Sequence, residues 1–257
     1  MSTPAILYLG DTSLNGAAGY LAGLMTAFGM AFDYFPSDRT LSAKAARDAR
    51  KLFVLSDYPS AMMAADAAAA VLAQVKHGAG LIMIGGWESF HGHGGNWDGT
   101  AIGDALPVNI SGEDDRENCD QTAIVTIKQE HEISAGLPWK ERPPTVGGYN
   151  RVTAREGAMT VLEVLPFKVH HAAHGYHFAR QEPHPLLVAG AHGAGRTAAL
   201  MTDLAPHWVG GLVDWGDDER VTAQAAGSWQ IEVGNLYAQF VLNLLAWTGR
   251  LERTQIT

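Results

Sequence analysis

Residues 51–86 read KLFVLSDYPSAMMAADAAAAVLAQVKHGAGLIMIGG, and this stretch specifies the class of fold. The apolar runs at 51–55 and 80–84 lack polar alternation, which is typical of parallel strands covered on both faces. Between them, residues 60–77 are rich in Ala and Met and predict a helix. Two strands joined by one helix indicate a right-handed unit of a parallel sheet, so the sequence predicts an α/β protein.

The same alternation begins further upstream. Residues 5–10 form another apolar run, and apolar residues at spacings of three and four predict a helix over 14–28. A strand at 32–35 is followed by Pro36, and an Ala-rich helical stretch covers 42–50. Four strands that alternate with helices predict a mostly parallel central sheet with helices on both faces.

The pattern changes beyond residue 87. Apolar runs predict strands at 123–127 and 160–165, and residues 185–201 resemble a hairpin around a glycine turn. Apolar residues at helical spacing over 229–245 predict a final helix that packs on the sheet. We find no linker, repeat or low-complexity tract, so we expect one domain over residues 1–257 that ends with this hairpin and helix.

Charge and cysteine content narrow the classes of partner. The chain has 257 residues, with 18 Lys and Arg against 27 Asp and Glu, and its formal net charge is −9. We expect neither nucleic-acid nor membrane binding, because both normally require a basic face. Residues 12–32 are uncharged but rich in glycine and hydroxyl side chains, which favours a buried helix over a membrane span. The single cysteine, Cys119, requires no oxidising compartment, so we expect a cytoplasmic protein.

Ligands of open α/β sheets bind where the loops after the parallel strands converge. Such loops lie at 11–13, 36–38 and 57–58, and the densest group of reactive side chains follows the strand at 80–84: Gly86, Trp87, Glu88, Ser89, His91 and His93. Glu88 and His91 are three residues apart and can share one face of a short helix, with Ser89 as its N-cap. This arrangement suits acid–base chemistry. The alternative is structural, with Gly86 allowing a tight strand exit and Trp87 covering the core.

A second group of candidates lies near the C-terminus: Asp203, His207, Trp208 and Trp215. Aromatic rings beside a carboxylate and an imidazole can bind a sugar or another small polar ligand by stacking and hydrogen bonding. The alternative is again structural. In that interpretation both indoles belong to the core, and Asp203 caps a loop and pairs with Arg196.

Histidine is concentrated between residues 170 and 184: His170, His171, His174, His177 and His184. Imidazole is a common zinc ligand, so a divalent metal is one interpretation. The other is a polar loop, because Gly175 interrupts any helix and no cysteine accompanies the histidines. We assign no metal ligand and predict no cofactor, since neither a dinucleotide-binding nor a Walker-type glycine motif is present.

An ordered set of motifs points to a known family. GAGLIMIGGWESF at 78–90, GGNWDGT at 94–100 and LPV at 106–108 come first, and HEISAGLP at 131–138, GAGR at 193–196, Thr202-Asp203, Trp208 and Asp214-Trp215 follow. Together they resemble the putative glutamine amidotransferase family, a branch of the class I glutamine amidotransferase-like superfamily. The resemblance implies a flavodoxin-like three-layer sandwich. It extends, more distantly, to domains of the trehalose-utilisation type.

The sequence departs from this superfamily at the nucleophile. A class I amidotransferase carries a cysteine on the sharp turn after a strand, where its pKa is lowered. Here the turn after the strand at 80–84 has no thiol, and Cys119 is expected in an acidic loop whose carboxylates disfavour a thiolate. We therefore expect no cysteine-dependent glutaminase activity.

The resulting hypothesis is a hydrolase-like enzyme that acts on a small polar molecule. The candidate acid–base residues are Glu88, His91, Asp203 and His207. The candidate ligand-binding residues are Gly86, Trp87, Ser89, His93, Trp208 and Trp215. The missing nucleophile leaves a second hypothesis open, a non-catalytic small-molecule-binding module or a homo-oligomeric scaffold.

Overall fold

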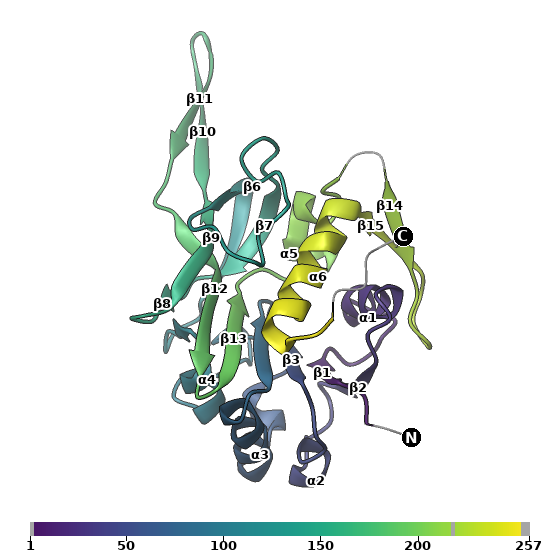
Figure 1. Ribbon diagram of the computed structural model, residues 1–257. Coiled ribbons are helices and arrows are strands. Elements are labelled where there is room, and N and C mark those ends of the chain that lie inside the picture. Colours follow the sequence, from purple (N-terminus) through teal and green to yellow (C-terminus); the bar gives the residue numbers. More distant parts are fainter. Residues whose placement is uncertain (1–2, 217–218, 253–257) are drawn as a thin grey trace.

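The computed structural model describes residues 3–216 and 219–252. Nine strands form one sheet in the order β2-β1-β3-β4-β13-β12-β9-β6-β7 (Figure 1). Its first half is parallel and consists of β2 (Phe32–Pro36), β1 (Ile6–Gly10), β3 (Leu52–Ser56), β4 (Gly80–Ile84) and β13 (Gly195–Leu200). Every residue of β1, β3 and β4 is buried, which explains why these strands lack polar alternation.

The second half of the sheet is antiparallel. It contains β12 (His184–His192), β9 (Met159–Leu165), β6 (Arg116–Ile127) and β7 (Thr145–Asn150). The change of direction occurs at the tight turn between β12 and β13, which confirms the predicted glycine hairpin.

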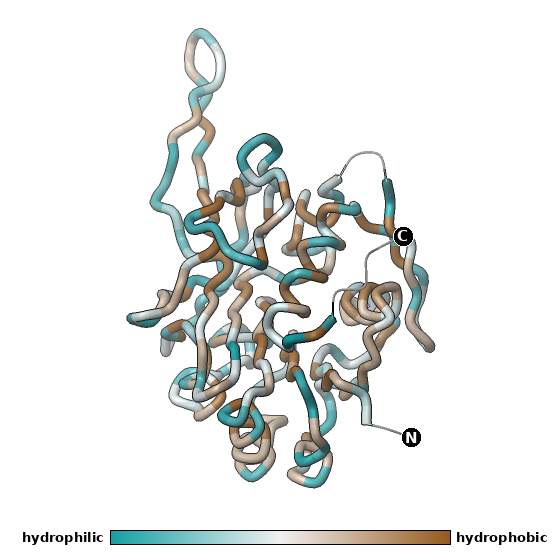
Figure 2. Tube along the Cα trace, viewed as in Figure 1, coloured by the Kyte–Doolittle hydropathy of each residue, from teal (hydrophilic) through white to brown (hydrophobic). Residues whose placement is uncertain are grey.

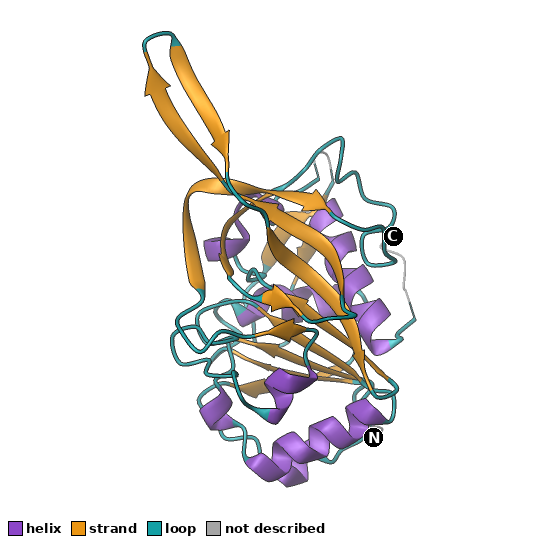
Figure 3. Ribbon diagram, turned by 90° about the vertical axis from the view of Figure 1, so that its left-hand side faces the viewer, coloured by secondary structure: helices purple, strands orange, loops and turns teal. Residues whose placement is uncertain are grey.

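Helices cover both faces of the sheet (Figures 1 and 3). The helices α1 (Ala18–Ala27) and α6 (Asn235–Gly249) pack together on one face, and α2 (Ala43–Ala46), α3 (Ala65–Lys76) and α4 (Ala101–Ala105) lie on the other. The predicted flavodoxin-like α/β fold is confirmed. Figure 2 shows hydrophobic residues along the central strands. No helix among the described residues is long and apolar enough to cross a membrane.

Three small two-stranded sheets flank the main one: β5 (Val108–Asn109) with β8 (Thr153–Ala154), β10 (Phe167–Ala172) with β11 (Gly175–Arg180), and β14 (Arg220–Ala223) with β15 (Ile231–Gly234). The expected polar loop at 170–184 is therefore wrong, because most of it forms the β10–β11 hairpin. The final helix begins at Asn235, not at Trp229, because residues 231–234 form β15 and pair with β14.

Other element boundaries differ from the prediction. The helix predicted over 60–77 divides into η1 (Ser60–Met62) and α3, because Met63 forms a bridge with Leu41 and keeps the chain extended. The acidic loop expected around Cys119 is wrong as well, because this residue lies within β6. The strand β6 therefore begins at Arg116, before the predicted strand at 123–127, and its pairing with β7 shifts register between Asn118 and Ala123.

Candidate functional site

Four carboxylates meet where the parallel strands end. Asp11 follows β1, Asp57 follows β3, Glu88 follows β4 by a few residues, and Asp203 follows β13. Burial raises the pKa of each of the other three, and repulsion by the Asp11 charge raises it further; the Asp57 charge also raises the pKa of Asp203. We call these four side chains the acid cluster. Parallel strands bring them together because their carboxyl ends share one edge of the sheet.

Asp57 occupies a strained turn. Its φ is 51°, in the left-handed region that non-glycine residues rarely adopt, directly at the end of β3. Its carboxylate accepts the Glu88 N–H at 2.8 Å, and its own N–H donates to the Ser89 hydroxyl at 3.0 Å. Burial raises the pKa of Asp57 to about 7, against the lowering effect of the hydrogen bond from Glu88. One proton can therefore stay on this carboxyl near neutral pH.

The exit of β4 is held by a buried polar network. The Gly86 N–H donates to the Asn150 side-chain oxygen at 3.0 Å, and the Asn150 amide donates to Asp115 at 2.8 Å. Asp115 in turn accepts the backbone N–H groups of His91 and Gly92. These contacts fix the loop that carries Glu88, so the position of its carboxyl group is set by β7 as well as by β4.

Glu88 is the acid-cluster residue within this loop. Burial and the Asp11 charge raise its pKa, and nearby His93 lowers it. The side chain is only partly buried, and its Oε1 lies 4.0 Å from the position that a Cβ at Gly94 would take. Glu88 therefore lies over the 93–94 turn, with an accessible carboxyl group next to an exposed imidazole.

Trp87 provides an accessible aromatic ring beside these carboxylates. The side chain is 46% exposed, and its ring centroid lies 6.5 Å from that of His93 and 6.1 Å from that of His207. The Arg116 guanidinium is 4.8 Å from the Trp87 ring centroid and is held by Asp114 at 2.9 and 2.7 Å. We call Trp87, His93, Arg116 and His207 the Trp87 platform.

Asp203 supports the loop before α5 (Pro206–Val209). Its Oδ1 accepts the N–H groups of Leu204 and Ala205 at 2.5 and 3.2 Å. Burial, together with the charge of Asp57, raises the pKa of Asp203 well above the usual carboxyl range. The pairing expected in the structural interpretation is wrong, because Arg196 donates to the Trp247 carbonyl at 2.7 Å instead.

His91 and Ser89 do not occupy the predicted short helix. Residues 86–100 form turns, and Phe90 has a φ of 50°, which is incompatible with a helix. The Ser89 hydroxyl accepts the Asp57 N–H, so it is not a helix N-cap. The His91 ring lies 2.7 Å from Asp98, so it pairs within its own loop. The prediction that Glu88 and His91 share a helix face is therefore wrong.

The two C-terminal tryptophans are buried in different places. Trp208 is 1% exposed, and its indole N–H donates to the Asn118 side chain at 2.8 Å. Trp215 packs against Trp139 with a centroid distance of 4.4 Å, and its N–H donates to the Arg142 carbonyl. Of the three tryptophans proposed to bind a ligand, Trp87 is the accessible one.

Sequence reasoning did not select several residues of this edge. Asp11 and Asp57 could have been found, because both directly follow predicted strands. Asn150 and Arg116 have no comparable local signal, since they lie on β7 and β6 and reach the site only through the antiparallel half of the sheet.

The histidines at 170–184 are spread along the β10–β11 hairpin and the start of β12. His170 lies directly opposite His177 across the hairpin. Among residues 3–216 and 219–252, no three or more His, Cys, Asp or Glu side chains are placed to hold a metal ion together. Metal binding by these histidines stays a prediction.

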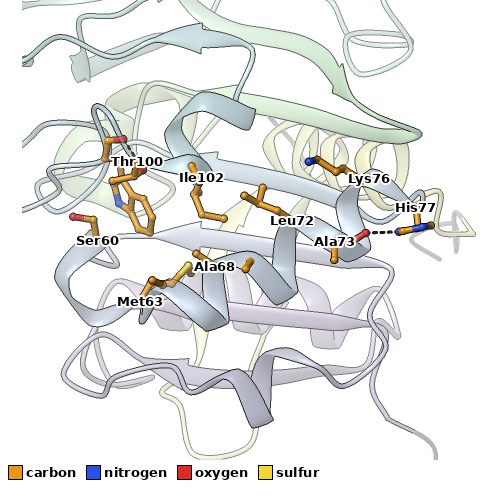
Figure 4. A pocket seen from close by; sticks show the side chains of 13 residues that line it. Ser60, Met63, Ala68, Leu72, Ala73, Lys76, His77, Thr100 and Ile102 are labelled. Atoms are coloured by element: carbon orange, nitrogen blue, oxygen red, sulfur yellow. Dashed lines mark hydrogen bonds between the residues drawn. The ribbon is translucent and has the colours of Figure 1, made fainter.

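A separate apolar groove of about 600 Å³ lies between α3 and α4 (Figure 4). Ala68, Leu72 and Ile102 line it, with Lys76 and His77 at one end. The groove lacks the carboxylates that acid–base chemistry requires. We therefore place the candidate site at the acid cluster.

Comparison with known proteins identifies the family. The family model described as putative glutamine amidotransferase matches residues 51–227. The chain belongs to this family. The resemblance predicted from the sequence motifs is thus confirmed. No curated protein matches the chain by sequence.

Solved structures support the fold of this amidotransferase-like protein. Cytoplasmic protein STM3548 from Salmonella typhimurium is 23% identical, with a TM-score of 0.66, and the match covers 95% of this chain and 98% of that one. Cytoplasmic protein STM1381 from Salmonella typhimurium LT2 is 24% identical, with a TM-score of 0.63 and coverages of 79% and 89%. A Thua-like protein from Bacteroides uniformis is 9% identical, with a TM-score of 0.51 and coverages of 96% and 93%. At these identities the likeness concerns the fold alone.

The family name does not give this amidotransferase-like protein a reactive thiol. Burial, and then the Glu117 charge, raise the pKa of Cys119 to about 11. A thiol with such a pKa is almost fully protonated at neutral pH and is a poor nucleophile.

Proposed function

We propose that this protein is a hydrolase-like acid–base enzyme whose small polar substrate binds against Trp87 at the ends of the parallel strands. The observation that carries the proposal is the accessible Glu88 carboxyl group, whose pKa is raised within the acid cluster and which lies beside His93. A carboxyl group whose pKa is raised by burial and by a neighbouring charge is a candidate for acid–base chemistry.

The acid cluster divides into groups that meet the substrate and groups that hold protons. Glu88 is the proposed catalytic acid, because it is partly exposed. Asp57 and Asp203 are positioning residues, since their carboxylates bind backbone N–H groups and their raised pKa values keep protons in the cluster. Like charges at short range cannot all ionise, so protonated and ionised carboxyl groups coexist there.

The Trp87 platform is the proposed binding surface. Its ring can stack on a sugar or another flat small molecule, and Arg116, His93 and His207 supply hydrogen bonds around it. This combination of one apolar surface with several polar groups is typical of sites for small polar ligands.

The reaction proposed for this site uses water as the nucleophile. Protonated Glu88 gives its proton to the leaving group as the bond to carbon breaks. A neighbouring base, His93 or an ionised carboxylate, takes the proton of the attacking water, whose oxygen forms the new bond. The high pKa of Cys119 supports a route that needs no thiolate.

The cellular setting is part of this proposal. Both Salmonella structures that resemble this chain are described as cytoplasmic proteins, which supports a cytoplasmic location here too. The reaction as written requires no cofactor. Elemental analysis of the purified protein tests the alternative in which histidines bind a divalent metal.

The main alternative is a binding module without turnover. The hydrogen bonds of Asp57 favour this alternative. Its carboxylate already accepts the backbone N–H groups of Glu88 and Trp87, so it serves to hold the loop. In that case the Trp87 platform would bind a small molecule, and the acid cluster would only shape the loops.

Turnover of a chromogenic panel separates the two functions. We would assay nitrophenyl esters, nitrophenyl glycosides and nitroanilides, and follow ligand binding by the difference in indole fluorescence between the wild type and Trp87→Phe. Glu88→Gln should reduce kcat about 10²- to 10⁴-fold without loss of binding, whereas the matched change Glu113→Gln in an exposed loop should not. Binding without turnover by the wild type would support the module, and unchanged turnover in Glu88→Gln would contradict the enzyme proposal.

A further inference from the structure

The β10–β11 hairpin stands apart from the rest of the molecule. It forms its own two-stranded sheet and projects from the body as an arm (Figures 1 and 3). We call residues 167–180 the arm. An isolated two-stranded hairpin is only marginally stable in water, so an arm of this kind gains stability when another surface covers it.

One face of the arm is aromatic. Val169 lies opposite Phe178 and His171 opposite Tyr176, so these side chains share a face. The Phe167 and Phe178 rings are 5.8 Å apart, and the His171 and Tyr176 rings are 5.4 Å apart. Yet Tyr176 and Phe178 are each 69% exposed. Two adjacent exposed aromatic side chains on a projecting element are typical of a docking surface.

The charge of the arm identifies the kind of partner. Residues 167–180 contain Lys168, Arg180 and four histidines but no Asp or Glu, so the arm carries +2 with its histidines neutral. Subtracting this from the net charge of −9 leaves −11 on the rest of the chain. A cationic arm is thus complementary to the anionic body of the same protein. That body also repels nucleic acid and anionic membranes, which disfavours them as partners.

We propose that the arm packs on the anionic body of a second copy of this chain and buries Tyr176 and Phe178 there. A two-fold dimer, in which each copy receives the arm of the other, is the closed assembly that satisfies both arms. The aromatic face supplies the apolar contact, and Arg180, which lies opposite Phe167 on that same face, pairs with acidic side chains of the partner. This inference does not depend on the proposed catalytic function.

The first test is the mass of the full-length protein in solution. Light scattering or sedimentation should give a multiple of the 27.5 kDa chain mass for the wild type. The double variant Tyr176→Ser with Phe178→Ser should weaken association at least about tenfold and give monomers. The matched control Trp229→Ser removes a side chain that is 50% exposed on the body, and it should leave the mass unchanged.

The second test addresses charge. The variant Arg180→Glu should weaken association about tenfold or more, and salt should weaken the wild-type oligomer because it screens exposed charges. Lys168→Glu, on the opposite face of the arm, is the matched control and should weaken association less than Arg180→Glu does.

Several outcomes would overturn the proposal. The first is a wild-type monomer at about 100 μM, where weak dimers with micromolar Kd values associate. The others are an unchanged mass in the serine double variant and an unchanged mass in Arg180→Glu. Arm-dependent binding of a short RNA or of anionic vesicles by a monomeric wild type would instead assign the arm to that partner. Circular dichroism and cooperative unfolding of each variant show whether the body has kept its fold.

Discussion

The Asp57 carboxylate lies against the α-carbon of Gly86. A Cβ at residue 86 would overlap with both carboxylate oxygens, and Oδ1 also accepts the Glu88 N–H at 2.8 Å. One side chain at the end of β3 therefore sets the course of the chain at the end of β4. The proton affinity of the acid cluster and the shape of the Glu88 loop depend on the same carboxyl group.

Replacing Gly86 should disturb this contact. Gly86→Ala places a methyl group on the Asp57 carboxylate at a φ of +154°, so we expect the free energy of unfolding to fall by more than about 2 kcal/mol. Urea denaturation measures this loss. Gly99→Ala is the control, because Gly99 also has a positive φ (+65°) but has no atom within 4 Å of the added methyl, and it should cost only about 1 kcal/mol. Equal losses in the two variants would show that the Asp57 contact is unimportant.

The raised pKa of Asp57 predicts a pH-dependent stability. Its folded-state pKa of about 7 exceeds the ordinary value of 3.8, so between these pH values the folded state binds more protons than the unfolded state. This contribution to stability is full below about pH 4 and is lost as the pH rises through 7, by at most about 1.4 kcal/mol per pH unit.

Asp57→Asn removes the titrating group, keeps the accepting oxygen and tolerates a positive φ. Unfolding free energies measured from pH 4 to 8 should therefore fall less steeply in Asp57→Asn than in the wild type. Asp104→Asn, at an exposed position on α4, should keep the wild-type slope. A wild-type slope in Asp57→Asn would mean that another group is responsible.

The buried polar network at the exit of β4 should stabilise the folded state by as much as several hydrogen bonds. Asn150 is fully buried, and Asn150→Ala removes the acceptor of the Gly86 N–H and a donor to Asp115. We expect a loss of about 3 kcal/mol, because the buried partners stay unsatisfied. Asn109→Ala, which removes a single exposed bond of 3.4 Å to Thr153, should change stability by less than about 0.5 kcal/mol. Thermal unfolding that shows no difference between these variants would refute the role of the network.

Cys119 should react slowly with alkylating agents. With its pKa raised to about 11, the rate of alkylation by iodoacetamide at pH 8 should be about a hundredfold below that of an ordinary thiol, and it should still increase above pH 9. Mass spectrometry of timed samples gives the rate, and the urea-unfolded chain serves as the fast control. A rate that levels off below pH 9 would contradict the raised pKa. Cys119→Ser should leave any turnover unchanged.

The parallel half of the fold is visible in the sequence because its signal is local. All residues of β1, β3 and β4 are buried on both faces, so each strand is an uninterrupted apolar run. The β12–β13 hairpin is visible for a similar reason, since its glycine turn lies between two apolar runs. The β10–β11 hairpin is hidden, because an exposed ribbon has polar residues on one face and exposed aromatic residues on the other.

The candidate site likewise has a part that the local sequence indicates and a part that it does not. Trp87, Glu88 and His93 can be selected from one loop because they are close in sequence. The hydrogen bond between Glu88 and Asp57 spans 31 positions, and that between Gly86 and Asn150 spans 64. No local sequence pattern indicates contacts over such separations.

Residue types and their order were enough to predict the α/β fold, the family and the loop in which chemistry is expected. Which carboxyl groups meet, which of them keep a proton and which tryptophan stays accessible followed from packing alone. The reason is physical: a pKa depends on burial and on neighbouring charges, and both arise when β13 and the antiparallel strands are brought against β4.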